Sequence, residues 1–196
     1  MNPEFLINTQ RLQLRLLSVD EAVDFARLIQ YSPSLHEWID WCYARFNQQD
    51  AERFILATRL NWIKADAYGF AVVDKATQQL VGMVAINEFS TTFNMASLGY
   101  WIGDDYQQQG FGKEALAALI EWSFAQLKLT RLEIICDPSN IPSQRLAKAC
   151  DAKQECLAQN RFIFHGQPKT GLVFSIIPEP ISSGSHQYSN QYQLKQ

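Results

Sequence analysis

The sequence predicts an α+β fold, in which a mixed, mostly antiparallel sheet of six to seven strands is flanked by helices. Three apolar segments over 68–74, 80–89 and 96–102 follow one another through short polar connections, as strands joined in antiparallel hairpins do. An amphipathic helix over 112–127 and a strand over 131–136 come next, and they predict a right-handed β-α-β crossover. The pattern therefore combines antiparallel hairpins with a parallel pair.

The N-terminal part predicts one more strand and two helices. Residues 11–16 alternate between apolar and polar side chains, which is typical of a half-buried strand. Ser18 and Glu21 have the spacing of a capping box, which predicts a helix that runs toward Tyr31. An imperfect apolar face predicts a second helix over 50–64.

The C-terminal part predicts a short helix and a closing hairpin. The helix follows Asn140. Two strands over 153–164 and 171–177 then flank a turn at His165 and Gly166.

Length and composition predict one domain. The chain has 196 residues, of which 47% are hydrophobic and 19% are charged, as in an ordinary globular protein. We expect a single domain over 1–178 and a polar C-terminal tail over 179–196, rich in Ser, Gln and Asn. The sequence leaves the oligomeric state open, including a homodimer.

Charge and cysteine content argue against several classes of partner. A net charge of −3, without a cluster of Lys and Arg, argues against nucleic acid. The four cysteines form no Cys-x-x-Cys pair and no matching His array, so we expect reduced thiols and no metal site. We find no targeting segment and no stretch apolar enough to enter a membrane, which favours a cytoplasmic protein.

A polar turn with paired glycines precedes the helix over 112–127. Gly110 and Gly112 leave the backbone unobstructed, so successive N–H groups can converge on an anion at the positive end of the helix dipole. A pyrophosphate is the expected ligand. The residues expected to contact it are Gln107, Gln108, Gln109, Gly110, Phe111, Gly112 and Lys113.

The same glycine turn can also be compared with two other nucleotide-binding motifs. Gly110 to Ala115 also matches the Gly-x-Gly-x-x-Ala dinucleotide fingerprint, and Glu133 lies near the expected position of its ribose-binding acid. In that fold, however, the first glycine closes the strand at once, whereas residues 104–109 intervene here. A nucleoside-triphosphate loop fits less well, because Glu114 occupies the position of its Ser or Thr. A merely structural turn also stays open.

The spacing Gln107-x-x-Gly110-x-Gly112 resembles the acetyl-coenzyme A signature of the GNAT N-acetyltransferase superfamily. Asn140-x-x-Ser143 is similar to a motif of the family's ribosomal-protein-serine/alanine N-terminal acetyltransferases. The resemblance extends from about residue 11 to 177 in the order of elements. It implies the acyl-CoA N-acyltransferase fold, with acetyl-CoA as cosubstrate and no metal.

The resemblance also implies roles for individual residues. The backbone of Tyr100, Trp101 and Ile102 would pair with the pantetheine arm of acetyl-CoA. Asn140 would hydrogen-bond this arm, although it is also a good helix N-cap. Ser143 would lie near the sulfur, where its hydroxyl passes a proton to the departing thiolate.

The general base is less determined. The resemblance implies a glutamate in the penultimate strand, but the nearest matching position holds Arg161. Glu88, at the end of the strand over 80–89, is the substitute candidate. As an alternative, a carboxylate at a strand end simply faces water.

Trp38 and Trp41 are candidates to wall the acceptor cleft. They lie in a segment similar to the Trp-rich linker of the ribosomal-protein acetyltransferases, and the neighbouring Glu37 and Asp40 could attract a cationic N-terminus. The alternative is that both tryptophans only pack in the core.

The sequence thus predicts an enzyme that moves acetyl from acetyl-CoA to a primary amine by direct attack. The lack of a strong base favours the N-terminal α-amine of a protein, such as a ribosomal protein, because about a tenth of such amines are neutral at pH 7. A polyamine or aminoglycoside acceptor is one alternative. A noncatalytic acyl-CoA-binding module is the other.

Overall fold

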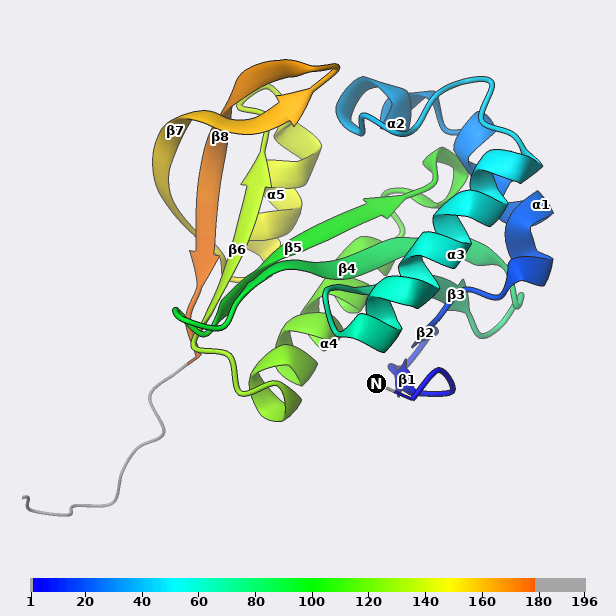
Figure 1. Ribbon diagram of the computed structural model, residues 1–196, viewed down its shortest axis with the longest axis horizontal. Helices are drawn as coiled ribbons and strands as arrows, with labels where there is room; N and C mark the ends of the chain where they lie inside the picture. The colour runs from blue at the N-terminus through cyan, green and yellow to red at the C-terminus, as the bar shows by residue number, and fades with distance from the viewer. Residues whose placement is uncertain (1, 179–196) are drawn as a thin grey trace, which may run out of the picture.

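The computed structural model describes residues 2–178, so the predicted tail over 179–196 lies outside the described residues. Within them, eight strands form one mixed sheet in the order β1-β2-β3-β4-β5-β6-β8-β7 (Figure 1). The strands are β1 (Leu6–Asn8), β2 (Leu12–Arg15), β3 (Tyr68–Asp74), β4 (Leu80–Ser90), β5 (Met95–Ile102), β6 (Arg131–Cys136), β7 (Lys153–Phe164) and β8 (Gln167–Ile176). The helices are α1 (Ala22–Gln30), α2 (Pro33–Trp38), α3 (Gln48–Lys64), α4 (Phe111–Gln126) and α5 (Ile141–Ala149), with short 3₁₀ turns η1 (Val19–Glu21) and η2 (Asp104–Tyr106).

The predicted α+β fold is confirmed, including the parallel pairing of β5 with β6. The sheet has one strand more than the expected six to seven, because the three-residue β1 adds to its edge. Three residues are too few to show a periodic pattern. The six-residue α2, with Pro33 in its first turn, is likewise too short for such a pattern. The strand β8 begins at Gln167, earlier than the expected start at residue 171.

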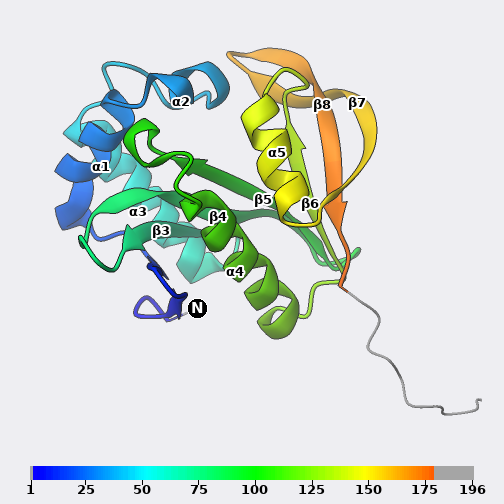
Figure 2. The same ribbon diagram turned by 180° about the vertical axis from the view of Figure 1, so that it is seen from behind.

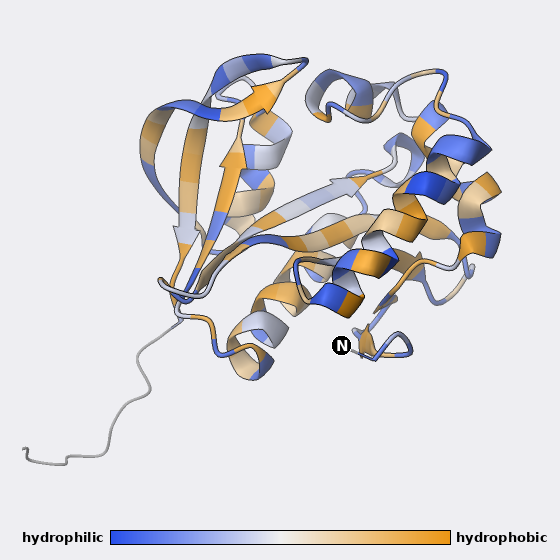
Figure 3. Ribbon diagram, viewed as in Figure 1, coloured by the Kyte–Doolittle hydropathy of each residue, from blue (hydrophilic) through white to orange (hydrophobic). Residues whose placement is uncertain are grey.

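Two apolar cores lie on opposite faces of the sheet. On β3, Phe70 and Val72 belong to the core shared with α4, while Ala71 and Val73 belong to the core shared with α1 and α3. This alternation is the two-residue period of a strand. α3 covers one face of the sheet, and α4 and α5 lie on the other (Figures 1 and 2). β4 is apolar along most of its length (Figure 3), because it is buried between the two layers.

The sheet opens between β5 and β6. Their paired register ends at Ser97 and Glu133, although β5 continues to Ile102 and β6 to Cys136. Beyond that point the two strands diverge (Figure 1), while β5 stays paired with β4. One edge of β5 therefore borders a gap in the middle of the molecule.

The backbone of β5 presents hydrogen-bonding groups to this gap. The N–H group of Gly103 donates to the carbonyl of Val81 at 2.9 Å, which fixes the phase of the β4–β5 ladder. Because such pairs alternate along an antiparallel ladder, the backbone groups of Tyr100 and Ile102 point away from β4 and toward the gap.

Two further features concern residues 2–178 only. None of the helices described there combines the length and the apolar character that a bilayer crossing requires. The same residues hold no group of three His, Cys, Asp or Glu side chains arranged for a metal ion.

Candidate functional site

Two cavities occupy the gap between β5 and β6. The loop cavity has a volume of about 510 Å³ and extends along the glycine turn and α5. The hairpin cavity has a volume of about 730 Å³ and extends along β4, β6 and the β7–β8 hairpin. Both volumes are typical of small-molecule sites. The residues that line both cavities are Trp38, Ile39, Tyr100, Trp101, Asn140 and Ser143. A molecule in one cavity can therefore meet a molecule in the other at Tyr100 and Ser143.

The glycine turn ends in a row of free backbone donors. Gly110 has a φ of +82° and is the N-cap of α4. The first N–H of this turn with a helical partner is that of Glu114, which donates to the carbonyl of Gly110 at 3.1 Å. Within residues 2–178, the N–H groups of residues 108–113 have no hydrogen-bond acceptor. Such a row at a helix N-terminus is the arrangement that binds phosphate.

Gln107 differs from the other predicted loop residues. Its N–H donates to the carbonyl of Asp104 at 3.3 Å, so the free row begins at Gln108. Its side-chain Nε2 lies 3.0 Å from the hydroxyl of Ser34 and 3.0 Å from the carbonyl of Ile102. The side chain of Gln107 therefore ties the loop to α2 and to the end of β5.

Gly112 has a packing role as well. A Cβ at this position would lie 3.1 Å from Leu146 Cδ2 and 3.4 Å from Ile102 Cγ1. The missing side chain therefore allows α5, which carries Ser143, to pack closely against the start of α4 and the end of β5.

The loop is anchored by residues that sequence reasoning missed. Glu114 accepts hydrogen bonds from the backbone N–H of Arg11 at 2.8 Å and from its Nε at 2.6 Å, and Arg11 Nη1 donates to the carbonyl of Gln109 at 2.9 Å. Burial raises the pKa of Glu114, but hydrogen bonds from Thr9 and Arg11 outweigh this effect and lower the pKa below its usual value. No local pattern links Arg11 to a loop about a hundred residues away.

Tyr100, Asn140 and Ser143 form one hydrogen-bonded group at the junction of the cavities. The hydroxyl of Tyr100 lies 2.9 Å from the carbonyl of Ser143 and 3.0 Å from its Oγ. Asn140 Oδ1 accepts the N–H of Ser143 at 3.0 Å and so caps α5. Within residues 2–178, Asn140 Nδ2 has no acceptor. The cap and a role toward a ligand are thus compatible.

Burial raises the pKa of Tyr100, so its phenol stays protonated. The two closing strands, β7 and β8, contain no tyrosine that could act beside Ser143. The structure instead brings Tyr100 there from β5, through its side chain. The signal for this placement was the alternation along β5, which puts Tyr100 on the face that α5 covers.

Glu88 lines the hairpin cavity near the end of β4. Its φ of +50° and a register shift between Asn87 and Ser90 make it part of a bulge, and bulges commonly re-aim side chains beside functional sites. Its side chain is 62% exposed and lies 3.6 Å from Arg161 Nη2. The structure therefore brings Glu88 and Ser143 to the same cavity without a direct contact between them.

The two predicted cleft tryptophans have different surroundings. Trp38 lines both cavities. Trp41 lines the hairpin cavity, but it also stacks on Phe54 with ring centroids 4.3 Å apart, so it packs in the core as well. Asp40, between them, accepts a hydrogen bond from the backbone N–H of His165 in the hairpin turn, and its Oδ1 lies 2.8 Å from the Nδ1 of that residue.

Comparisons with known proteins agree on one family. The family model described as an acetyltransferase (GNAT) domain matches residues 11–153. A solved structure from Vibrio cholerae, provisionally named a ribosomal-protein-serine acetyltransferase, is 63% identical, with a TM-score of 0.85 over 91% of this chain and 100% of that one. The ribosomal-protein-serine acetyltransferase of Escherichia coli is 30% identical over 100 residues, or 50% of this chain and 56% of that protein. The microcin C7 self-immunity acetyltransferase, solved with acetyl-CoA and AMP, shares the fold at 22% identity, with a TM-score of 0.79 over 87% and 94% of the two chains.

Proposed function

The chain belongs to the GNAT acetyltransferase family, and on this premise we propose that it transfers acetyl from acetyl-CoA to the N-terminal α-amine of a protein, such as a ribosomal protein. The observation that carries the proposal is the junction of two cavities at Tyr100 and Ser143, one of which ends at the free N–H groups of the glycine loop. The names of the Vibrio cholerae and Escherichia coli relatives support the choice of acceptor.

The loop cavity is the proposed coenzyme site. The free N–H groups of residues 108–113 would hold its pyrophosphate, and the backbone groups of Tyr100 and Ile102 at the open edge of β5 would pair with the pantetheine arm. Trp101, between them on β5, lines both cavities, and Asn140 Nδ2 offers a further donor. Acetyl-CoA supplies the acetyl group as an activated thioester.

In the proposed reaction, the neutral amine attacks from the hairpin cavity. A new C–N bond forms, the C–S bond breaks, and the amine loses one proton to Glu88 or to water. A backbone N–H of the open β5 edge stabilises the charge on the carbonyl oxygen. Ser143 then gives its hydroxyl proton to the thiolate and takes a proton back from water, with Tyr100 bound to its Oγ.

The hairpin cavity has the character expected for a cationic acceptor. Trp38 and Trp41 provide aromatic walls, and the carboxylates of Glu37 and Glu88 border the same space. Negative charge of this kind attracts an α-ammonium group.

The test is thiol release from acetyl-CoA with a panel of acceptors. N-terminal peptides of ribosomal proteins should be acetylated with higher kcat/KM than polyamines or aminoglycosides. Faster turnover with either small-molecule class would overturn the proposed acceptor. No turnover with any acceptor, although calorimetry detects acetyl-CoA binding, would overturn the proposed transfer.

A further inference from the structure

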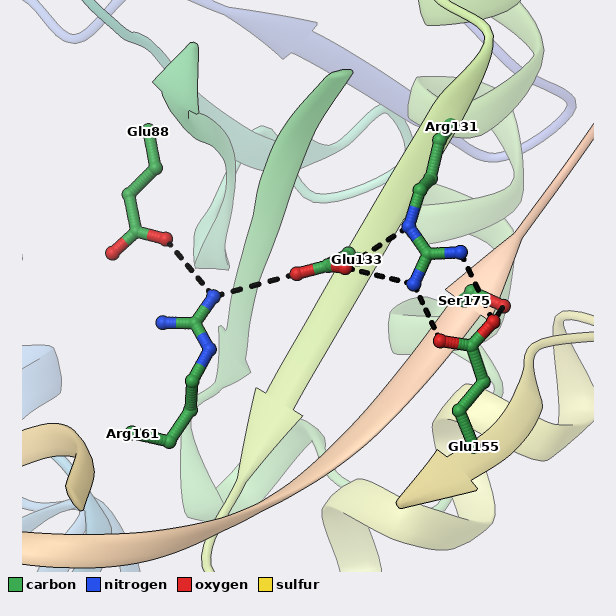
Figure 4. A network of polar contacts seen from close by, with 6 residues as sticks. All are labelled: Glu88, Arg131, Glu133, Glu155, Arg161 and Ser175. Atoms are coloured by element: carbon green, nitrogen blue, oxygen red, sulfur yellow. Dashed lines mark hydrogen bonds and ion pairs between the residues drawn. The ribbon is translucent and has the colours of Figure 1, made fainter. Parts of the chain in front are cut away.

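A network of charged side chains crosses the sheet beside the hairpin cavity (Figure 4). Arg131 is fully engaged there. Its Nε and Nη2 donate to Glu133 Oε1 at 2.9 and 2.8 Å, and its Nη1 donates to Glu155 Oε1 at 3.0 Å. Glu133 Oε1 therefore accepts the hydrogen bonds of Arg131, and only Oε2 faces Arg161.

Arg161 is only partly engaged. All of its contacts run through Nη2, which lies 3.4 Å from Glu133 Oε2 and 3.6 Å from Glu88 Oε2 (Figure 4). Both distances exceed the 2.7–2.9 Å typical of a strong charge-assisted hydrogen bond. Within residues 2–178, Nε and Nη1 have no acceptor. The guanidinium lines the hairpin cavity and its side chain is 31% exposed, so it offers an open donor edge there.

The backbone around Arg161 is built to place it there. The β7–β8 register shifts between Ala158 and Phe162, and Asn160 has a φ of +52°, so the strand bulges next to Arg161. Across the ladder, a Cβ on Gly171 would lie 2.9 Å from Arg161 Cβ and 3.0 Å from its Cγ. The glycine therefore leaves the space that the arginine stem occupies.

From this geometry we infer that Arg161 binds an acidic side chain in the first few residues of the acceptor, an inference that rests on the proposed transfer to a protein N-terminus. A guanidinium fork recognises a carboxylate through two parallel hydrogen bonds, and Nη1 with Nη2 is one such edge, because Nη1 has no acceptor among the described residues and both contacts of Nη2 are long. Lys169, the cross-strand partner of Phe162, lines the same cavity and adds positive charge. The preferred substrates are thus proteins with Asp or Glu shortly after the N-terminal residue.

The experiment compares peptides that differ by one isosteric change. Peptides that begin with Ser carry Asp or Asn at position 2, 3 or 4, and kcat/KM is measured from thiol release at constant ionic strength. At one position we expect kcat/KM for the Asp peptide to exceed that for the Asn peptide by about 10-fold or more, because a hydrogen bond between charged groups supplies a free energy of that size. In Arg161→Gln the ratio should fall to about 1, and Arg161→Lys, which keeps the charge without the fork, should give an intermediate ratio.

Arg53→Gln is the matched control, because Arg53 lies on the exposed face of α3 outside both cavities, and it should keep the wild-type ratio. Thermal unfolding of each variant checks the fold. Equal kcat/KM for Asp and Asn peptides in the wild type, or a ratio that persists in Arg161→Gln, overturns the inference while leaving acetyl transfer intact. No turnover with any peptide overturns the proposed function itself.

Discussion

The hydroxyl groups of Tyr100 and Ser143 lie in contact, and each has a single proton to donate. Tyr100 can donate to the carbonyl of Ser143 at 2.9 Å or to its Oγ at 3.0 Å, but not fully to both. If it donates to the carbonyl, the Ser143 hydroxyl must turn to Tyr100 to keep the second hydrogen bond. If it donates to Oγ, the proton of Ser143 is free for a ligand. Tyr100 therefore controls the direction of the proton that the proposed reaction needs.

This coupling predicts the kinetics of single and double variants. Ser143→Ala should lower kcat about 100-fold, the lower range for loss of a proton donor, with coenzyme affinity unchanged. Tyr100→Phe removes only the hydroxyl and should lower kcat by a smaller factor. The double variant should be no slower than Ser143→Ala alone, because both act through one proton. Steady-state kinetics and calorimetry measure these quantities, and independent effects that multiply would contradict the coupling.

At the residue scale, the sequence predicts chemical types better than partners. Asn140 and Ser143, which the motif singled out, line both cavities. The alternation along β5 indicates the face of Tyr100 but not its contact with Ser143, and nothing local links Arg11 to the glycine loop, because both contacts join segments far apart in the sequence. The open donor edge of Arg161 likewise depends on a bulge in β7, which the sequence pattern of that strand does not predict.

At the scale of elements, the N-terminus of α4 depends on Gly110. Its φ of +82° is a left-handed conformation that costs an L-residue about 1–2 kcal/mol, and a Cβ would lie 3.2 Å from Arg11 Nη2. Gly110→Ala should therefore lower the free energy of unfolding by about that amount and should also weaken coenzyme binding, because the strain falls on the free N–H row.

Gly166→Ala is the control for this prediction. Gly166 has a φ of +71°, and a Cβ added there would meet nothing within 4 Å, so the substitution brings similar strain to the hairpin turn, away from the loop. It should lose comparable stability in denaturant titrations and keep wild-type coenzyme affinity by calorimetry. Equal coenzyme affinity in Gly110→Ala and Gly166→Ala would show that the glycine loop does not hold the phosphates.

Elements with a long apolar stretch or a helical spacing of apolar residues were the predictable ones. β3 through β5 and α4 show their pattern because each packs a long stretch of side chains against a core. β1 and α2 are held by neighbours instead. Ser34, in the first turn of α2, bonds to Asp104 and Gln107 beyond β5, and these partners are not readable from the segment itself.

At the scale of the whole molecule, the β7–β8 hairpin reaches across the open side of the sheet toward α2 (Figure 1). Asp40 Oδ1 accepts the backbone N–H of His165 at 2.7 Å and lies 2.8 Å from its Nδ1. Trp41 and Phe164, the chain neighbours of Asp40 and His165, line the hairpin cavity together with Trp38. The contact therefore joins the β7–β8 hairpin to the segment that follows α2, next to residues that line the space proposed for the acceptor.

Removing this contact should affect the acceptor and not the coenzyme. Asp40→Ala loses both contacts to His165 and should raise the KM for peptides about two- to fivefold, since both side chains are exposed and such pairs supply at most about 1 kcal/mol. His165→Ala keeps the backbone N–H donor and should raise KM less. Calorimetry should give wild-type acetyl-CoA affinity for both variants, because the loop cavity lies on the other side of Tyr100 and Ser143. A loss of coenzyme affinity in Asp40→Ala, or a larger effect of His165→Ala, would contradict this role for the hairpin.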